Sequence, residues 1–195
     1  MGDLLTDDVI SQKLSTDQIY SMSNDPWNQS LMLCPEKKQI VKFLADYANK
    51  YLRCKRLVDI GCGLGCFCNF LHNWTKFKQI TGIDNATSAI VKASKNFGHL
   101  ENVNFDVIDI IDRTSAIKLN THNPDVLFMS DTTWCIIEKL PDFKRFLREN
   151  FRGKSISFFL FMLLQKSYLL LIFANGFSFC VTLFATGFPF FPFID

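Results

Sequence analysis

Two patterns of hydrophobic residues alternate along the first 150 positions of the chain: short continuous runs, and segments in which hydrophobic residues are spaced three or four positions apart. Short apolar runs, typical of buried strands, occupy residues 56–60, 79–84, 103–109 and 124–130. Between these runs, apolar residues recur every three or four positions, which predicts helices that begin at Pro35, after Gly65, after Asn85 and near residue 138. Strands that alternate with helices pair in parallel through helical crossovers. The pattern therefore predicts an α/β fold, a three-layer, mostly parallel, doubly wound sheet.

The first predicted helix follows a polar, mixed segment, residues 1–34. Pro35 suits its first turn, because the N–H that proline lacks has no partner there in any helix. Its apolar face is expected to carry Ile40, Phe43, Leu44, Tyr47 and Tyr51.

The composition of the chain changes near residue 153. Residues 150–161 supply a candidate fifth strand, but no alternating strand pair follows, so the sheet is expected to be incomplete at its C-terminus. Residues 167–194 carry no charge, and residues 167–187 are long and apolar enough to span a bilayer, with Lys166 at the interface. The hydrophobic tail, residues 162–195, has three interpretations: a membrane-associated segment, an unusual packed domain end, or a terminus foreign to the domain.

Charge and cysteine content indicate the cellular location of the protein, but they do not identify its partners. The formal net charge of the 195 residues is +2, which gives no indication of a nucleic-acid partner. Seven cysteines without paired spacing and an acidic N-terminus without an apolar run favour a reducing, cytoplasmic location, with the membrane tail as the alternative. Cys62, Cys66 and Cys68 lie close together, but no second Cys or His pair completes a zinc site, so we predict buried thiols and no metal. The oligomeric state stays open.

A glycine-rich loop follows the first predicted strand. Gly61, Gly63 and Gly65 let the backbone turn tightly and let a ligand approach the main chain and the following helix N-terminus. A dinucleotide fingerprint would place its third glycine at position 66, which is Cys66, and Asp59 beside the loop would repel a pyrophosphate. Both features disfavour a nucleotide-dependent oxidoreductase, which is kept as an alternative.

A second acid narrows the class of ligand. Asp84 ends the next predicted strand, where a carboxylate can accept hydrogen bonds from both hydroxyls of a ribose. Asn85 beside it is the candidate cap of the following helix. The loop and the two acids together favour an adenosine-type ligand with a cationic part and no phosphate. S-adenosylmethionine meets this description.

The sequence DIGCGLG, followed by GID and by an acid that closes the third strand, resembles the class I, Rossmann-like family of S-adenosylmethionine-dependent methyltransferases. The resemblance covers about residues 35–150. It implies a Rossmann-like sheet and a cofactor held by the first motif, which spans Asp59 to Gly65 and includes Cys62. It further implies that Asp84 binds the ribose, that Asp109 meets the adenine amino group, and that Ile110 lies beside the ring. Asp109 has an alternative role as a surface acid. The fourth motif falls on Ser130–Trp134, with Asp131 and Trp134 as catalytic candidates.

A shorter stretch, NDPWNQ at residues 24–29, resembles the DPW segment of a subset of small-molecule methyltransferases, which includes nodulation enzymes that N-methylate chitin-oligosaccharide signals. In such enzymes an N-terminal segment folds over the cofactor. This resemblance implies a cap formed by residues 1–34 before a cofactor-binding domain, residues 35–161. Trp27 would close the pocket, and Lys38 would meet the cofactor carboxylate.

The expected function is transfer of a methyl group from S-adenosylmethionine to a nitrogen or oxygen acceptor on a small molecule. Because the methyl group is already activated, the protein mainly has to align the acceptor and exclude water. A base is needed only where the acceptor must lose a proton, and Asp131, Thr132 and Thr133 are the candidates. The alternative is a truncated or membrane-tethered cofactor-binding fragment without activity.

Overall fold

One seven-stranded sheet organises the protein. The computed structural model describes residues 14–30, 35–130, 132, 139–150, 157–164, 167–174 and 178–185. The strand order is β3-β2-β1-β4-β5-β6-β7. In chain order the strands are β1 (Arg56–Ile60), β2 (Gln79–Asp84), β3 (Val103–Val107), β4 (Val126–Ser130), β5 (Ser157–Leu164), β6 (Ser167–Ala174) and β7 (Ser178–Ala185). β1 to β5 pair in parallel, whereas β6 and β7 are antiparallel additions. The Rossmann-like, mostly parallel sheet expected from the sequence is confirmed.

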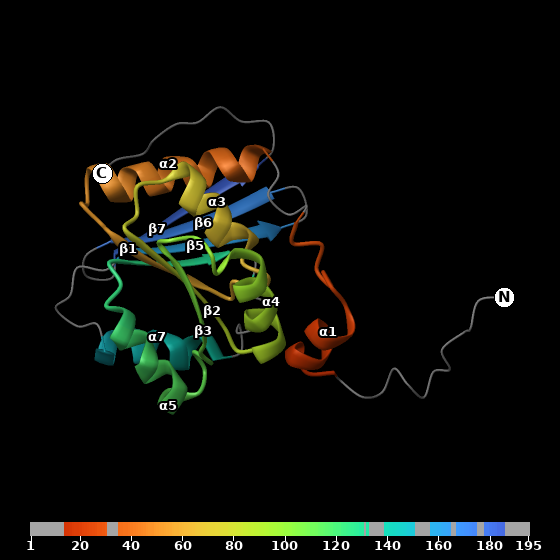
Figure 1. Ribbon diagram of the computed structural model, residues 1–195. Coiled ribbons are helices and arrows are strands. Elements are labelled where there is room, and N and C mark those ends of the chain that lie inside the picture. The colour runs from red at the N-terminus through yellow and green to blue at the C-terminus, as the bar shows by residue number, and fades with distance from the viewer. Residues whose placement is uncertain are drawn as a thin grey trace.

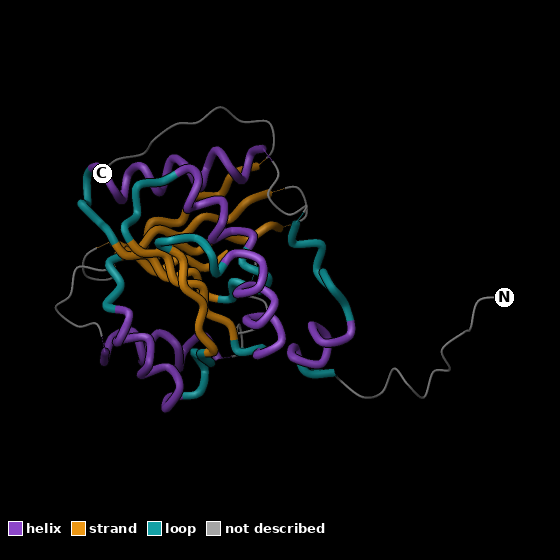
Figure 2. The backbone as a smooth tube through the Cα atoms, viewed as in Figure 1, coloured by secondary structure: helices purple, strands orange, loops and turns teal. Residues whose placement is uncertain are grey.

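Helices cover both faces of the sheet. The described helices are α1 (Thr16–Met22), α2 (Pro35–Lys50), α3 (Cys66–Trp74), α4 (Thr87–Phe97), α5 (Arg113–Ala116), the 3-10 helix η2 (Ile117–His122) and α7 (Leu140–Asn150). α2 and α3 lie on one face of the sheet, and α5 and α7 lie on the other (Figure 1). The strands run between these two helical layers (Figure 2). Helix α1 lies outside the layers and contacts α4.

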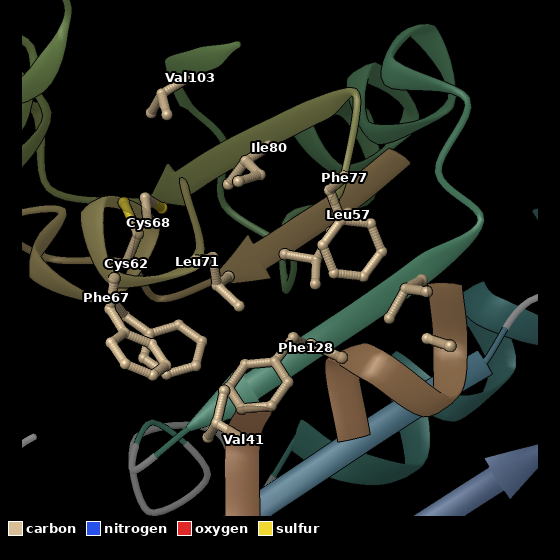
Figure 3. Packing of buried hydrophobic residues seen from close by; sticks show 14 of the residues in the cluster. Val41, Leu57, Cys62, Phe67, Cys68, Leu71, Phe77, Ile80, Val103 and Phe128 are labelled. Atoms are coloured by element: carbon tan, nitrogen blue, oxygen red, sulfur yellow. The ribbon is translucent and has the colours of Figure 1, made fainter. Parts of the chain in front are cut away.

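Two hydrophobic clusters fill the spaces between the sheet and its helices. On one face, Val41 of α2 and Phe67 of α3 pack with Leu57, Ile80 and Phe128 of the strands (Figure 3). The rings of Phe67 and Phe128 stack with their centroids 4.6 Å apart. On the other face, alternate residues of the same strands pack against α7; they are Val58, Ile60, Ile83, Leu127 and Met129. Burial on both faces explains why these strands are continuous apolar runs rather than alternating ones.

Helix α2 buries a different face from the one predicted. Its buried positions are Val41, Leu44, Ala45 and Ala48. Phe43, Tyr47 and Tyr51 are 55%, 41% and 64% exposed. Both sets follow helical spacing, so periodicity alone did not distinguish them. The set with small residues is the one that faces the sheet, and only Leu44 of the predicted face is fully buried.

The C-terminal segment contains the strand pair that the sequence did not reveal. β6 pairs with β5 from Phe158↔Phe173 to Leu164↔Ser167, and β7 pairs with β6 from Ser167↔Ala185 to Ala174↔Ser178. The expectation that no strand pair follows residue 161 is therefore wrong. An uncharged apolar run without alternation is compatible with a strand as well as with a membrane span, so composition did not decide.

A membrane span at residues 167–187, one of the three interpretations of the tail, has no support in the described fold. Its described residues belong to β6 and β7. Within the described parts of the chain, no helix has the length and apolar character needed to cross a bilayer. The division into residues 1–34, 35–161 and 162–195 stays a prediction, although β5 ends at Leu164 and so crosses its second boundary.

Candidate functional site

The glycine loop connects β1 to α3 at the carboxyl end of the sheet. Gly61, Gly63 and Gly65 have φ angles of +75°, +52° and +77°. Residues with a Cβ rarely adopt this left-handed region, so the turn depends on glycine. The backbone N–H groups of Gly61 and Cys62 donate to the carbonyl of Ile83 at 2.8 and 3.0 Å. The loop is thus held against the end of the neighbouring strand β2.

Asp84 joins the glycine loop to the start of α4. Its Oδ2 accepts a hydrogen bond from the Gly63 N–H at 3.0 Å, and its Oδ1 accepts one from the Ala86 N–H at 3.0 Å. The side chain is buried, and this burial raises the pKa of the carboxyl although the backbone hydrogen bonds oppose the shift. The structure therefore brings together the loop and the acid that the sequence paired. Helix α4 begins at Thr87 with Ala86 at its N-cap, so the prediction that Asn85 caps it is wrong; Asn85 is exposed.

The next amide of the loop is bonded to the N-terminal segment. Gln29 Oε1 accepts a hydrogen bond from the Leu64 N–H at 2.7 Å, and Gln29 Nε2 donates to the Tyr20 hydroxyl at 2.9 Å. In this ligand-free arrangement the amides of Gly63 and Leu64 both donate within the protein. The Gly63 N–H is bonded to Asp84, and the Leu64 N–H is bonded to the side chain of Gln29.

Asp59 lies below the loop and is shielded from solvent. It is 2% exposed, and burial raises its pKa to about 7. The Cys68 thiol donates to its Oδ2 at 3.5 Å, and this bond and the charge of Lys37 lower the pKa in part. The charge of Asp84 acts in the opposite direction. Asp59 is therefore a titratable group beneath the cradle rather than a carboxylate open to solvent.

Lys37 is a site residue that the sequence analysis missed. It is 6% exposed, whereas its neighbour Lys38, the predicted partner of the cofactor carboxylate, is exposed. Helical phase carried the signal, because Lys37 precedes Val41, Leu44 and Ala48 by four, seven and eleven residues and so shares their buried face. Gln29 and Tyr20 were missed as well. Gln29 lay inside the quoted NDPWNQ stretch, and no sequence signal marked Tyr20.

The three clustered cysteines are separate thiols. Cys62 and Cys68 are buried and Cys66 is partly buried, and all three are free. Cys62 packs into the hydrophobic core together with Cys68, and burial raises the pKa of both thiols (Figure 3). The Cys62 side chain thus points away from the cradle. Among the described residues, no group of three or more His, Cys, Asp or Glu is arranged to hold a metal ion.

The end of β3 lies next to the end of β2. The Ile108 N–H donates to the Asp84 carbonyl at 3.0 Å, and the chain continues through Asp109 to the buried Ile110. Asp109 Oδ1 accepts a hydrogen bond from the Ile111 N–H at 2.9 Å, so the carboxylate stabilises its own turn. This contact is compatible with the surface-acid alternative, and the adenine role stays a prediction.

The remaining predicted residues lie above the loop or outside the described residues. Trp27 is half-buried and packs against the cluster of Tyr20, Leu64, Ala86 and Ala89. Thr132, beyond the end of β4, donates to the Ser130 carbonyl at 3.0 Å, and its side chain occupies the space that a Cβ on Gly61 would need. Asp131 and Trp134, the catalytic candidates, lie outside the described residues.

Comparison with protein families identifies the domain. Residues 53–159 match the model of a methyltransferase domain family, which is more than half of the chain. The chain therefore belongs to the methyltransferase domain family. The class expected from the glycine loop and Asp84 is confirmed. No curated protein matches the sequence.

Solved structures share the fold. An S-adenosylmethionine-dependent methyltransferase from Anabaena variabilis is 23% identical, with 63% of this chain and 51% of that chain covered and a TM-score of 0.50. The plantazolicin methyltransferase BpumL, crystallised with a pentazolic desmethylPZN analog and SAH, is 20% identical, with coverages of 74% and 52% and a TM-score of 0.52. WbdD is 15% identical, with coverages of 67% and 30% and a TM-score of 0.51. The chain spans about half the length of the first two structures.

Proposed function

We propose that this protein binds S-adenosylmethionine and transfers its methyl group to a nitrogen or oxygen atom of a small molecule. The observation that carries the proposal is the hydrogen bond between the Asp84 carboxylate and the Gly63 N–H, 3.0 Å long. It joins a buried acid at the end of β2 to a glycine, which has no Cβ to block the approach of a ligand, and this arrangement suits an adenosine group with a free ribose.

The described residues fit this cofactor. Gly61, Gly63 and Gly65 add no side chains of their own to the cradle, so Thr132, Gln29 and Tyr20 can approach its backbone closely. The Gly63 amide, which is bonded to Asp84, and the buried acid at position 59 suit a phosphate-free cationic ligand better than a dinucleotide. Lys37, which is buried beside Asp59, replaces Lys38 as our candidate for the cofactor carboxylate, because its charge acts on the interior of the site.

The residues of this chain would bind, orient and shield the reactants. When bound, the cofactor would supply a methyl group activated on a sulfonium. Asp84 would orient the ribose, with Asp109 and Ile110 placed at the adenine. Tyr20 and Trp27 would exclude water from above, because they pack over Leu64. Asp131, which follows the end of β4 in the sequence, is our candidate to accept a proton from the acceptor group.

Two observations support a small-molecule acceptor. One structurally similar protein was crystallised with a desmethylPZN analog, and the NDPWNQ stretch resembles a segment of small-molecule enzymes. The enzymes that modify chitin-oligosaccharide signals are one candidate subset among the small-molecule methyltransferases. Turnover by this chain is itself part of the proposal, since the chain spans about half of the matched structures.

Isothermal titration calorimetry of the full chain with S-adenosylmethionine tests the proposal. We expect binding, and we expect Asp84→Ala to weaken it by about 10- to 100-fold, since a lost hydrogen bond to a charged group is worth about 1.5–3 kcal/mol. Asp46→Asn is the matched control, because Asp46 is an exposed partner of Lys42 on α2. Absence of binding, or equal binding by wild type and Asp84→Ala, would contradict the proposal. An acceptor screen that measures S-adenosylhomocysteine formation, with Asp131→Asn as the inactive comparison, then addresses turnover.

A further inference from the structure

Residues 15–30 form a strap that lies over the glycine loop. The strap consists of α1 and the loop that follows it, and α1 lies beside α4 (Figure 1). Tyr20 on α1 is 2% exposed and packs with Leu64, Ala86 and Ala89. The strap is therefore packed onto the loop and the start of α4.

Polar contacts fix α1 to α4 at both of its ends. Ala86 has no side chain that can cap α4, and Asp17 takes this role by accepting hydrogen bonds from the Ser88 N–H at 2.7 Å and the Ser88 hydroxyl at 2.8 Å. At the other end, Lys92 of α4 donates to the carbonyl of Tyr20 and, at 2.8 Å, to that of Ser23. α1 is thus held in one orientation by two sets of hydrogen bonds.

Gln29 fixes the second half of the strap to the glycine loop. Its side-chain amide accepts from the Leu64 N–H at 2.7 Å and donates to the Tyr20 hydroxyl at 2.9 Å. A Cβ added to Gly63 would collide with both Gln29 and Tyr20, so the strap and the loop are in direct contact. Asp25 supports Gln29 by accepting a hydrogen bond from its backbone N–H at 2.7 Å.

The same contact covers the acid proposed to bind the ribose. Asp84 is 8% exposed and accepts a hydrogen bond from the Gly63 N–H at 3.0 Å, and the Tyr20 hydroxyl lies 2.5 Å from the position of a Cβ on the same glycine, so both side chains meet at Gly63. A ligand that reaches Asp84 has to displace Tyr20, and Tyr20 is held by Gln29. Entry to the cradle therefore requires movement of the strap.

We propose that Gln29 is a positioning residue that latches the strap onto the glycine loop, and that an adenosine-type ligand enters and leaves only when this latch opens. The ligand part of this inference rests on the proposed function. The latch itself is a property of the ligand-free protein. Removal of the Gln29 amide should therefore loosen the strap without any ligand and should accelerate both ligand entry and ligand release.

Two measurements test the latch, with S-adenosylhomocysteine as the probe. Hydrogen exchange of the ligand-free full chain should show about tenfold faster exchange in residues 15–30 and at Leu64 for Gln29→Ala, which corresponds to loss of about one hydrogen bond. Stopped-flow binding should show association and dissociation rate constants that both rise by about tenfold. Gln29→Glu should stay close to wild type, because a carboxylate can accept from the Leu64 N–H and from the Tyr20 hydroxyl. Asn24→Ala, an exposed change on the same strap, is the control.

The outcomes separate the latch from the proposed function. Unchanged exchange in Gln29→Ala would overturn the latch, whether or not the probe binds. Faster exchange with unchanged rate constants would overturn the gating of ligand entry. Failure of the wild-type chain to bind S-adenosylhomocysteine would overturn the proposed function and the gating, while the exchange data would still decide the latch.

Discussion

Lys37 and Asp59 are both buried, and the charge of Lys37 acts to lower the pKa of the Asp59 carboxyl. Burial is the larger effect and raises this pKa to about 7, so Asp59 changes its charge near neutral pH. A group that titrates there, below a loop proposed to hold a cationic cofactor, makes the stability of this site sensitive to pH.

Because of Asp59, the free energy of unfolding should fall as the pH rises from about 4 to about 7. The pKa of Asp59 is about 7 in the folded protein and near 3.8 in the unfolded chain, so the unfolded state ionises first and is favoured across this window. Above the window both states are ionised and the effect is constant. Urea unfolding at several pH values should show a slope from pH 5 to 7 that Asp59→Asn removes. Identical slopes for the two proteins would contradict the assignment.

Lys37 and Lys38 should respond in opposite ways to the same substitution. Lys37→Met leaves a buried Asp59 without a nearby cation, so at pH 8 we expect a loss of about 3 kcal/mol and a further rise in the pKa of Asp59. Lys38→Met changes an exposed side chain and should stay within about 0.5 kcal/mol of wild type. Urea unfolding at pH 8 makes the comparison. Equal losses for the two variants would show that helical phase does not distinguish these lysines.

Gly63→Ala and Gly65→Ala should destabilise the protein by a similar backbone effect but change different neighbours. Both glycines have positive φ angles, so a Cβ costs about 1–2 kcal/mol at either position. A Cβ at Gly63 meets Gln29 and Tyr20, whereas at Gly65 it meets Phe105 at 2.7 Å. Hydrogen exchange should therefore increase in residues 15–30 for Gly63→Ala and not for Gly65→Ala. Similar exchange in the two variants would argue against contact between strap and loop.

Asp125 should stabilise the amino ends of β1 and β4, opposite the glycine loop. The pH dependence of this stabilisation is the reverse of that predicted for Asp59. It accepts hydrogen bonds from the Lys55 N–H at 2.8 Å, the Arg56 N–H at 3.0 Å and the Arg56 guanidinium at 2.7 Å. Burial acts to raise its pKa, but these bonds outweigh burial and lower it. The stabilisation is therefore present above pH 3.8, the unfolded value, and is lost as the pH falls through the lowered pKa.

Asp125→Ala should accordingly cost about 1–3 kcal/mol at pH 7, and the difference from wild type should shrink near pH 3. Urea unfolding at the two pH values measures this change. Asp142→Asn is the control, since Asp142 forms an exposed pair with Arg145 on α7 and should have little effect. An equal difference at both pH values would contradict a role for the ionised carboxylate.

Predictions from local sequence succeeded where a residue has one structural option. The positions of Gly61, Gly63 and Gly65 predicted a tight loop, and all three have the positive φ angles that such a turn requires. Asp84 was predicted at the end of a strand beside this loop, and it bonds to the Gly63 N–H. The four parallel strands up to Ser130 were predicted from short, largely apolar runs; β1, β2 and β4 are almost wholly buried, whereas β3, at the edge of the sheet, is buried only at Val103.

Predictions from local sequence were wrong where one segment fits two structural interpretations. Helix α2 carries an aromatic stripe and an aliphatic stripe at the same spacing, and only contact with the sheet selects the second. The uncharged C-terminal run lacks the alternation that predicts a strand pair, yet its described residues pair as β6 and β7. In both cases the sequence does not show what the segment packs or pairs with: the sheet for α2, and the neighbouring strands for β6 and β7.

The sequence by itself therefore determined the strand-to-helix turn, the acid that follows the second strand, and the family to which they belong. These features are local, because φ angles and strand ends depend on neighbouring residues. The tertiary structure alone decided that Lys37 is buried whereas Lys38 is exposed, that Asp59 is buried with a pKa of about 7, and that Gln29 bonds to Leu64. Those relationships depend on desolvation and on contacts between distant segments, which residue spacing does not encode.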